Sequence, residues 1–323
     1  MKAFITGIGG FAGYHLANLL LEEGYEISGL DHCPEKSERL KALAGKIKYF
    51  QADITKIEEI DKAMKNVVPD TVFHLAGISH VGETWKKRKL TFEVNFFGTM
   101  NVLDSLRKYC RNAIVVLVGS GEQYGNVSPS RQPIKEEEPL YPRSPYGVSK
   151  AAQEMLGRQY ATSEWMNVIL IRAFNHCGAY QDPTFAVSDF AKQIASAEAG
   201  KGDPVLRVGN LDVKRDFTDV RDTVRGYLMA SKNGQSGDIF NLSGGRAYML
   251  SEVVDMLKKL SDISIRVVME SERFRPVDIP VLCGDNTKAK RDLGWIPEIP
   301  LVSTLRWTLD YWREKVPGRE KKS

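Results

Sequence analysis

Short apolar runs alternate with longer amphipathic stretches through the first half of the chain. The runs are nearly continuous in apolar side chains, which predicts strands that are buried on both faces of a sheet. The stretches between them have the length and the apolar spacing of helices. We expect strands at residues 2–6, 25–31, 47–51, 71–75, 113–119 and 167–172, and helices at residues 12–23, 57–65, 95–109 and 146–164.

This alternation is typical of an α/β protein with a parallel sheet. Parallel strands are joined by helices that cover both faces of the sheet, and the crossover connections are right-handed. We therefore expect a doubly wound sheet of the Rossmann type. In such a sheet, ligands bind in the crevice at the carboxyl ends of the strands.

The pattern loosens after residue 172, and a smaller second lobe is expected there. We predict a large lobe from residues 1–172 and 216–244, and a C-terminal α/β lobe from residues 173–215 and 245–323. The elements expected in this half are a helix at about 185–199, a strand at 204–209, a helix that begins at Phe217 and ends near Ser231, a strand at 238–242, a helix at 251–260, a strand at 264–269, and a Pro-rich tail with Trp295, Trp307 and Trp312.

Composition limits the class of protein. Of 323 residues, 42% are hydrophobic and 27% are charged, which is ordinary for a soluble globular protein. The net charge is 45 − 41 = +4, and the basic residues are spread out, so no nucleic-acid surface is expected. Four cysteines and five histidines show no metal-ligand spacing. No apolar run could cross a bilayer and no signal peptide is apparent, so we expect a cytoplasmic protein without a metal.

The sequence TGIGGFAG at residues 6–13 follows the first predicted strand and opens the first predicted helix. In such a turn Gly7 permits the tight bend, Gly10 lets backbone N–H groups approach a pyrophosphate, and Gly13 lets the helix pack closely against the strand. The positive end of the helix favours the phosphates. The motif predicts a dinucleotide site, and the alternative is a glycine-rich turn without a ligand.

Two carboxylates follow the next predicted strands. Asp31 ends the second strand, where a carboxylate accepts hydrogen bonds from the adenosine ribose and repels a 2′-phosphate. This position favours NAD(H), while NADP(H) stays open, and the alternative for Asp31 is a loop cap. Asp53 follows the third strand, where it can bind the adenine amino group or cap the next helix.

A second motif, YGVSK at residues 146–150, places Tyr146 and Lys150 four residues apart on one face of a predicted helix. An ammonium near a phenol lowers the phenol pKa, so Tyr146 can exchange a proton with a carbonyl or alcohol oxygen. Ser120 follows the fifth predicted strand, and its hydroxyl can bind the same oxygen. A chance helix pair and a turn-forming serine are the alternatives.

These motifs occur in one order along essentially the whole chain. TGIGGFAG is followed by LAG at residues 75–77, Asn95, Ser120, YGVSK, and RAFN at residues 172–175. The chain resembles the extended short-chain dehydrogenase/reductases, in the branch that modifies nucleotide sugars. The resemblance implies a Ser120–Tyr146–Lys150 triad with Asn95 as a helper in proton transfer. It also implies a homodimer formed through the helices at residues 95–109 and 146–164.

The second half narrows the resemblance to one group within this branch. Its segments resemble the GDP-6-deoxy-4-keto-mannose reductases, which make GDP-rhamnose and are close relatives of the GDP-mannose 4,6-dehydratases. The segments are AFNHCG (173–178), DFAKQI (189–194), VGNL (208–211), RDFTDVRD (215–222) and RFRPVD (273–278).

A diphosphate site is also expected on chemical grounds. Arg215 and Arg275 are expected in loops that face the cleft. Their guanidinium groups match phosphate oxygens, and Asn175 can donate a hydrogen bond to the same diphosphate. Asp189 or Lys192 can bind the base, with helix surface as the alternative. The expected substrate-binding set is Ser79, His80, Asn175, Asp189, Lys192, Arg215, Arg275 and Asp278. The expected cofactor-binding set is Gly7, Gly9, Gly10, Phe11, Gly13, Asp31, Asp53, Ile54, Leu75, Ala76, Gly77, Tyr146, Lys150 and His176.

The sequence predicts the fold more directly than it predicts the reaction. Glu122 lies where the dehydratases keep their extra base, but the reductases have a Glu there too. Gly121 replaces a polar residue of the dehydratases, and HCPEK at residues 32–36 lacks their Arg-Arg-Ser-Ser run, whereas His80 matches them better. The balance favours an NAD(P)H-dependent reductase of a GDP-4-keto-6-deoxy-hexose. The alternatives are a dehydratase or C4 epimerase with tightly bound NAD, and a non-catalytic dinucleotide-binding protein.

Overall fold

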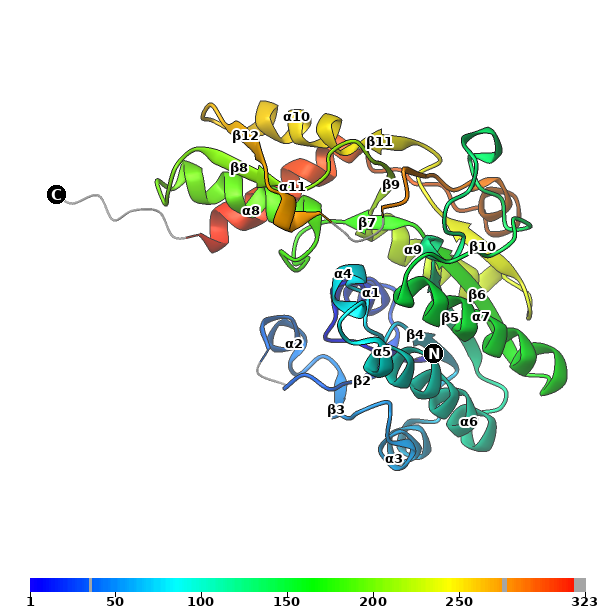
Figure 1. The fold of residues 1–323 in the computed structure, drawn as a ribbon. Coiled ribbons are helices and arrows are strands. Elements are labelled where there is room, and N and C mark those ends of the chain that lie inside the picture. Colours follow the sequence, from blue (N-terminus) through cyan, green and yellow to red (C-terminus); the bar gives the residue numbers. More distant parts are fainter. Residues whose placement is uncertain (35–36, 275–277, 317–323) are drawn as a thin grey trace.

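The computed structural model describes residues 1–34, 37–274 and 278–316, and its largest element is a seven-stranded sheet. The strands are β1 (Lys2–Thr6), β2 (Glu26–Asp31), β3 (Lys48–Gln51), β4 (Thr71–His74), β5 (Ile114–Ser120), β6 (Asn167–Ala173) and β10 (Ile239–Leu242). All neighbours are parallel, in the order β10-β6-β5-β4-β1-β2-β3, so the chain starts inside the sheet and winds outward in both directions (Figure 1). The predicted doubly wound Rossmann sheet is confirmed.

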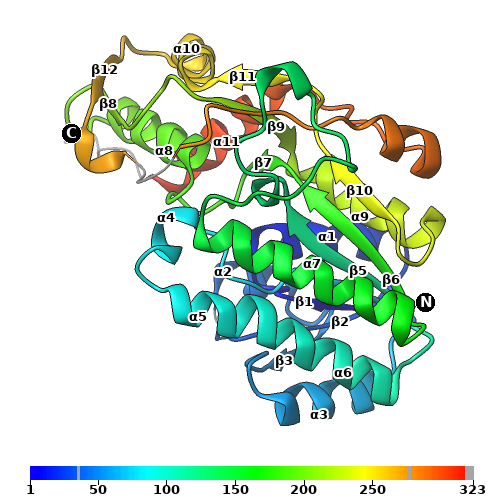
Figure 2. The ribbon, with the colours of Figure 1, turned by 45° about the vertical axis from the view of Figure 1, so that its right-hand side comes forward.

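Helices cover both faces of this sheet. On one face lie α1 (Phe11–Glu22), α2 (Glu38–Leu43) and α9 (Val220–Asn233), and on the other lie α3 (Ile57–Val67), α6 (Thr99–Tyr109) and α7 (Pro145–Ser163) (Figure 2). Leu16 and Leu228 belong to the first buried cluster, and Ile60 and Leu106 to the second. Because both faces are covered, the strands are buried almost throughout, as their apolar runs predict.

The smaller lobe lies at the carboxyl edge of the sheet, because its first strand begins directly after β6 ends (Figure 1). Its elements are β7 (Asn175–Cys177), α8 (Ala186–Glu198), β8 (Val205–Val208), β9 (Lys214–Asp219), β11 (Ala247–Met249), α10 (Leu250–Leu260), β12 (Arg266–Met269), β13 (Val281–Leu282) and α11 (Leu301–Lys315). β9 pairs with β7, β11 and β13, while β8 pairs with β12. A third core around Ile194, Leu257 and Leu305 joins its three helices.

Two expectations for the second half are wrong. The predicted helix start at Phe217 is the last part of β9, and α9 begins at Val220, because the Asp219 carboxylate accepts a hydrogen bond from the N–H of Arg221 at 2.9 Å and caps the helix. The Pro-rich tail contains α11, in which Leu301, Leu305 and Leu309 repeat every fourth residue and are buried.

The predicted lobe boundaries also need a correction. β9 belongs to the smaller lobe through Asp219, whereas the segment around Ala289, Leu293 and Trp295 returns to the core beneath the large sheet. Trp295 is fully buried, and its Nε1–H donates to the carbonyl oxygen of Asp222 in α9 at 2.8 Å.

The connection between β4 and α6 carries α4 (Val81–Thr84), α5 (Arg88–Phe92) and a π-helical turn (Glu93–Gly98). Such turns are frequent at functional sites, and Asn95 lies in this one. Within the described residues, every helix is too short or too polar to span a bilayer.

Candidate active site

The glycine turn after β1 is held by close packing. Gly7 has φ +75°, and a Cβ there would lie 2.8 Å from the backbone nitrogen of Ala76. A Cβ on Gly13 would lie 2.1 Å from the carbonyl oxygen of Gly7. No side chain caps α1, whose N-cap is Gly10, so the first N–H groups of the helix stay available to an anion. The turn therefore fits a pyrophosphate.

Two further members of the expected cofactor set meet beside this turn. The ring of Phe11 stacks on the ring of His176 with centroids 5.9 Å apart and an angle of 7°. The Nδ1 of His176 lies 3.0 Å from the carbonyl oxygen of Phe174, and burial lowers the pKa of His176. This stacked pair joins the start of α1 to the smaller lobe.

The carboxylate of Asp31 holds the glycine turn through hydrogen bonds to the backbone. Its Oδ2 accepts the N–H of Gly9 at 3.0 Å, and its Oδ1 accepts the N–H of Cys33 at 3.1 Å. Asp31 is thus a loop cap, and its buried carboxylate also stands at the end of β2 where a ribose would bind. His32 and Cys33 lie close enough to Asp31 to share an ion, and burial raises the pKa of the Cys33 thiol to about 11.

Arg39 in α2 was not anticipated from the sequence. Its Nε donates to the carbonyl oxygen of Gly9 at 2.7 Å, and its Nη1 donates to that of Tyr180 at 2.8 Å. The side chain therefore links the glycine turn to the smaller lobe. No sequence motif marks it, since the contact depends on the position of α2.

Asp53 does not cap the next helix, so that alternative is wrong. Its Oδ1 accepts hydrogen bonds from the N–H and the hydroxyl of Thr55, which closes a turn before α3, and the N-cap of α3 is Lys56. Ile54 is buried against Gly98, because a Cβ on Gly98 would lie 2.7 Å from Cδ1 of Ile54. The role of Asp53 in adenine binding and the place of Ile54 in the cofactor site remain predictions.

Leu75, Ala76 and Gly77 follow β4 and approach the catalytic residues. A Cβ on Gly77 would lie 2.9 Å from Oδ1 of Asn95 and 3.5 Å from Nζ of Lys150. The Asn95 side chain is fully buried. It accepts from the N–H of Ile78 at 2.7 Å and donates to the carbonyl oxygen of Ile78 at 3.0 Å and to Oγ of Ser149 at 2.9 Å.

Ser120 ends β5, and Tyr146 and Lys150 lie on α7, so the structure brings the expected triad together. Burial raises the pKa of Tyr146 to about 12, hydrogen bonding by the Ser120 hydroxyl acts against this rise, and the charge of Glu122 adds to it. The phenol is therefore protonated at neutral pH.

The electrostatics of Lys150 differ from expectation. Its Nζ donates to the carbonyl oxygen of Val118 at 3.0 Å and to Oε1 of Gln153 at 2.8 Å. Burial lowers the pKa of Lys150 to about 7. The expected lowering of the Tyr146 pKa by the ammonium is thus wrong here, because the ammonium is turned toward these two oxygens and burial dominates both groups.

Glu122 lies beside the triad and is half-buried. Its backbone N–H donates to Oγ of Ser120 at 3.2 Å. The neighbouring Gly121 has a structural reason, since a Cβ there would lie 3.0 Å from the ring of Phe174. A polar side chain at this position would therefore require Phe174 to move.

The smaller lobe pairs several expected substrate residues with each other. Arg215 lies in β9 and is buried, not in an open loop as expected, and it donates to the carbonyl oxygen of Ile279 at 2.6 Å. Its Nη2 lies 3.8 Å from Oδ1 of Asp278, whose Oδ2 accepts from Asn210 at 3.1 Å. Arg275 lies outside the described residues.

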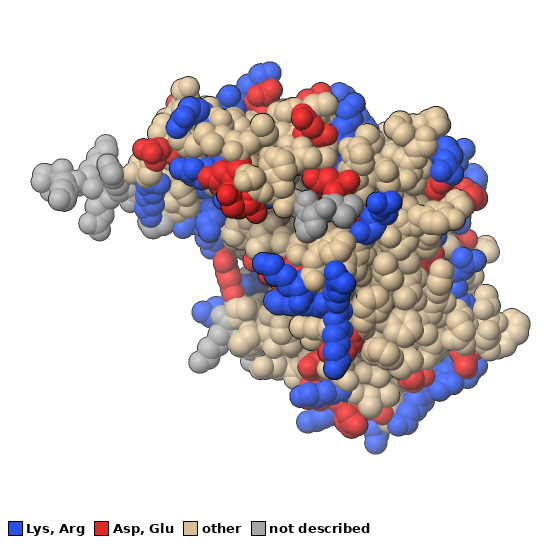
Figure 3. Space-filling model, viewed as in Figure 1, with Lys and Arg blue, Asp and Glu red and all other residues tan. Residues whose placement is uncertain are grey.

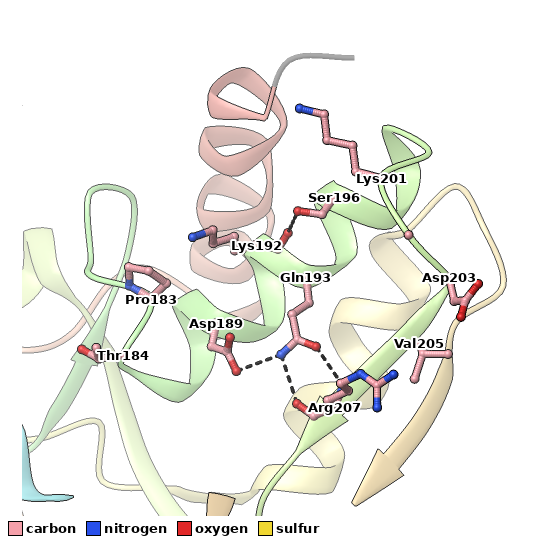
Figure 4. Close-up of a pocket in the computed structure, with 11 residues that line it drawn as sticks. Pro183, Thr184, Asp189, Lys192, Gln193, Ser196, Lys201, Asp203, Val205 and Arg207 are labelled. Atoms are coloured by element: carbon pink, nitrogen blue, oxygen red, sulfur yellow. Dashed lines mark hydrogen bonds between the residues drawn. The ribbon is translucent and has the colours of Figure 1, made fainter. Parts of the chain in front are cut away.

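Asp189 and Lys192 line one cavity of about 530 Å³ beside α8 (Figure 4). Oδ2 of Asp189 accepts hydrogen bonds from Arg273 at 2.8 Å and from Gln193 at 2.8 Å, so its carboxylate is already paired. Nζ of Lys192 lies 5.1 Å from the ring centre of Trp312. The cavity is large enough for a nucleoside.

His80 contacts both lobes. Its Nδ1 accepts the N–H of Glu83 at 3.2 Å and caps α4, while its ring meets the ring of Phe185, at the start of α8, edge-on at 5.8 Å. Ser79 beside it is exposed, and Asn175 begins β7 half-buried. These residues follow the carboxyl ends of β4 and β6, where a substrate is expected.

Basic side chains gather over α4 and α5 on the face shown in Figure 3. Lys86, Lys87, Arg88 and Lys89 are all exposed there. Lys87 pairs with Glu83 at 3.2 Å and Lys89 with Glu93 at 3.7 Å, which leaves a positive excess. This charge favours an anionic ligand. The run is visible in the sequence, where it begins six residues after His80.

Comparison with known proteins agrees with this geometry. The family described as GDP-mannose 4,6 dehydratase matches residues 4–308. The chain is 31% identical to GDP-6-deoxy-D-mannose reductase of Pseudomonas aeruginosa, over 98% of each chain. It is also 31% identical to UDP-glucose 4-epimerase of Bacillus subtilis, over 91% of this chain and 92% of the relative.

A solved structure agrees as well. The structure of RMD from Pseudomonas aeruginosa complexed with NADPH superposes with a TM-score of 0.85 and 29% identity, over 97% of this chain and 99% of the other. A single fold thus accounts for the glycine turn, the triad and the smaller lobe together. The protein belongs to the GDP-mannose 4,6 dehydratase family, and with it to the extended short-chain dehydrogenase/reductases.

Proposed function

We propose that the protein reduces the C4 ketone of a GDP-4-keto-6-deoxy-hexose, with GDP-rhamnose as a product. A bound nicotinamide dinucleotide would supply the hydride. Tyr146 gives its proton to the C4 oxygen, and the hydroxyl of Ser120 polarises that oxygen. Lys150 holds the ribose at the nicotinamide end, and Asn95 keeps the loop after β4 in place.

The observation that carries this proposal is the likeness to a GDP-6-deoxy-D-mannose reductase, which covers 98% of each chain. Ketone reduction needs an acid at the position of Tyr146, whereas dehydration and epimerisation both start by taking a proton from the C4 hydroxyl. Burial raises the pKa of Tyr146 to about 12, so the phenol carries the proton that reduction consumes.

The nucleotide is proposed to bind in the smaller lobe. Arg215 and Asp278 are close to one another, and Asn175 lies at the end of the neighbouring strand, which supports a diphosphate site between the lobes. The cavity beside α8, with Asp189 and Lys192 in its wall, has the size for a guanine base. The positive charge over α4 and α5 would attract the diphosphate.

NADH is proposed as the preferred cofactor, because the buried carboxylate of Asp31 would repel a 2′-phosphate. The solved relative holds NADPH, so use of both cofactors has to be measured. Replacement of Asp31 by Ser should raise the ratio of kcat/KM for NADPH over NADH. An unchanged ratio would contradict the role of Asp31.

A homodimer is proposed through α7 and the helical segment at residues 95–109. Each carries exposed large apolar side chains: Phe97 on the segment, and Val148 and Met155, seven residues apart, on one side of α7. Light scattering after chromatography should give a dimer for the wild type and a monomer for Met155→Glu.

The test of the reaction is absorbance at 340 nm with purified protein, NADH and GDP-4-keto-6-deoxy-mannose. Stoichiometric loss of NADH, with the product identified by NMR, is expected. Tyr146→Phe should lower kcat by on the order of 10²–10⁴ with binding nearly intact. A loss below about tenfold would contradict the role of Tyr146 as the acid.

A dehydratase or C4 epimerase is the second candidate, and the position of Glu122 is compatible with it. This carboxylate lies close enough to Tyr146 to raise its pKa, so it could act as the additional base that dehydration needs. Conversion of GDP-mannose to a 4-keto sugar without added cofactor would support a dehydratase. Glu122→Gln should abolish dehydration and spare simple reduction.

A further inference from the structure

We propose that the buried ion pair between Glu154 and Arg172 is a positioning pair, which holds Ser120 and Tyr146 at the separation that proton transfer requires. Neither residue belongs to the expected catalytic or binding sets. The proposal rests on the proposed function, because it assigns a part in that reaction to residues that do not touch the reacting atoms.

Ser120 is tied to the ion pair through Gln123. The N–H of Ser120 donates to Oε1 of Gln123 at 2.7 Å, and Nε2 of Gln123 donates to Oε2 of Glu154 at 2.7 Å. Gln123 is fully buried and lies directly against Gly119, where a Cβ would meet its Oε1 at 2.3 Å. The backbone of Ser120 therefore follows the position of the Glu154 carboxylate.

Tyr146 is tied to the same carboxylate through α7. Tyr146, Lys150 and Glu154 are spaced four residues apart and share one face of the helix. Arg172 on β6 donates to both oxygens of Glu154, from Nε at 2.7 Å and from Nη2 at 2.6 Å. A bidentate pair fixes direction as well as distance, so it sets the rotation and the height of α7 over the sheet.

The pair is anchored on its far side as well. Nη1 of Arg172 donates to the hydroxyl of Tyr124 at 2.7 Å and to the carbonyl oxygen of Glu136 at 2.8 Å. The hydroxyl of Tyr124 donates to Oδ1 of Asn241 on β10 at 2.8 Å. The network thus joins β5, α7, β6 and β10 beneath the triad, and Arg172 cannot follow a displaced helix.

Stability alone is a weak reason for such a pair. Two buried charges lose their hydration, and apolar residues of similar volume often stabilise a fold as well or better. Position is a stronger reason, because a misplacement of about 1 Å in an active site can lower the rate by about 10²-fold. Glu154 and Arg172 are 4% and 3% exposed, so their geometry is shielded from solvent.

The test compares two variants with a matched control. Glu154→Leu/Arg172→Met replaces both charges by apolar groups and leaves neither charge unpaired. Gln123→Met keeps the ion pair and breaks only its link to Ser120, so it remains informative if the double variant does not fold. The control is Glu164→Gln, which removes an exposed ion pair with Arg107 after the last turn of the same helix.

We expect both variants to lower kcat by about 10- to 100-fold while KM for the sugar nucleotide and Kd for NADH change less than about threefold. The control should match the wild type. Folded variants with a kcat within about threefold of the wild type would overturn the inference, as would KM and Kd values that rise as much as kcat falls, since that pattern indicates a general structural role.

Failure of the proposed function is distinguishable from failure of this inference. If the wild type dehydrates GDP-mannose instead, the same kcat comparison applies, because that reaction also uses Ser120 and Tyr146. If the wild type turns over no sugar nucleotide, crystal structures decide. A shift of Ser120 Oγ relative to Tyr146 on the order of 0.5 Å or more in Gln123→Met is expected, and an unmoved Ser120 overturns the inference.

Discussion

Arg172 and Lys150 are two buried cations, one bound to a carboxylate of α7 and the other part of that helix, and they have different partners. Arg172 is 3% exposed and is held by both carboxylate oxygens of Glu154. Lys150 is 5% exposed, and within the described residues its Nζ meets a carbonyl oxygen and a carboxamide oxygen but no carboxylate. Lys150 is part of α7 and Arg172 binds Glu154 of that helix, so the two cations differ in their partners.

The pKa values of the two groups differ accordingly. Burial alone would lower the pKa of Arg172, but hydrogen bonds and charge from Glu154 and Tyr124 outweigh it, so the pKa lies above its usual range. Lys150 has no such compensation, and burial lowers its pKa to about 7. The arginine is therefore a fixed charge, whereas the lysine can titrate near neutral pH. Arg172, whose position is proposed to matter, is bound by a carboxylate, whereas Lys150, which can titrate, has no carboxylate partner within the described residues.

Lys150→Met should break the chemistry without breaking the fold, and it has the largest expected effect. We expect kcat to fall on the order of 10²–10⁴, because the ammonium that is proposed to hold the nicotinamide ribose is lost. The free energy of unfolding should stay equal or rise, since a buried charge is removed. Assay of NADH oxidation and urea denaturation measure the two quantities. A large loss of stability with little loss of rate would reverse the comparison.

Arg172→Met should lower the free energy of unfolding, in contrast to Lys150→Met. Removing one partner leaves the carboxylate of Glu154 buried and unpaired, which lowers the free energy of unfolding by about 3–5 kcal/mol. Urea denaturation followed by tryptophan fluorescence measures this loss. If Arg172→Met and Lys150→Met changed stability equally, the contrast between a paired and an unpaired cation would be wrong.

The pH dependence of stability sharpens the comparison further. The pKa of Lys150 is lower in the folded state than in the unfolded chain, where it is near 10.5. Below pH 7 both states carry the proton, and between about pH 7 and 10.5 the unfolded state binds more protons, so stability from this group rises with pH. The slope is at most about 1.4 kcal/mol per pH unit. The difference between wild type and Lys150→Met, measured from pH 6.5 to 9, should show this rise, and a flat difference would contradict the lowered pKa.

An exposed ion pair gives the smallest effect. Arg107 and Glu164 lie 3.3 Å apart with side chains 43% and 31% exposed. Water and salt screen such a pair, so Glu164→Gln should change the free energy of unfolding by less than about 1 kcal/mol. A change as large as that of Arg172→Met would mean that burial does not set the energy of ion pairs in this protein.

The sequence predicted the cofactor end of the molecule more completely than the substrate end. Gly7, Gly13 and Tyr146 lie in motifs whose spacing is tied to one backbone geometry, so the turn and the triad follow from local sequence. Arg215 is different: its neighbours do not reveal that it sits in β9 and contacts Asp278, because β13 reaches β9 from a distant part of the chain.

Long-range pairings also explain what was missed near the triad. The spacing of Tyr146 and Glu154 on one face of α7 was readable, but the partner of Glu154 lies on another strand. The expected effect of Lys150 on Tyr146 failed for a related reason. The direction of its ammonium depends on Val118 and Gln153, which compete for it and are not part of any motif.

The return of Trp295 to the core beneath the large sheet bears on how the chain is made. During synthesis, α1 and β1 leave the ribosome first, but β10 and Trp295, which complete the same sheet and core, emerge more than two hundred residues later. The large lobe therefore cannot complete its core before most of the smaller lobe has been translated. A gene fragment that stops after β10 encodes the sheet without Ala289, Leu293 and Trp295, so the core beneath the sheet depends on the C-terminal part of the chain.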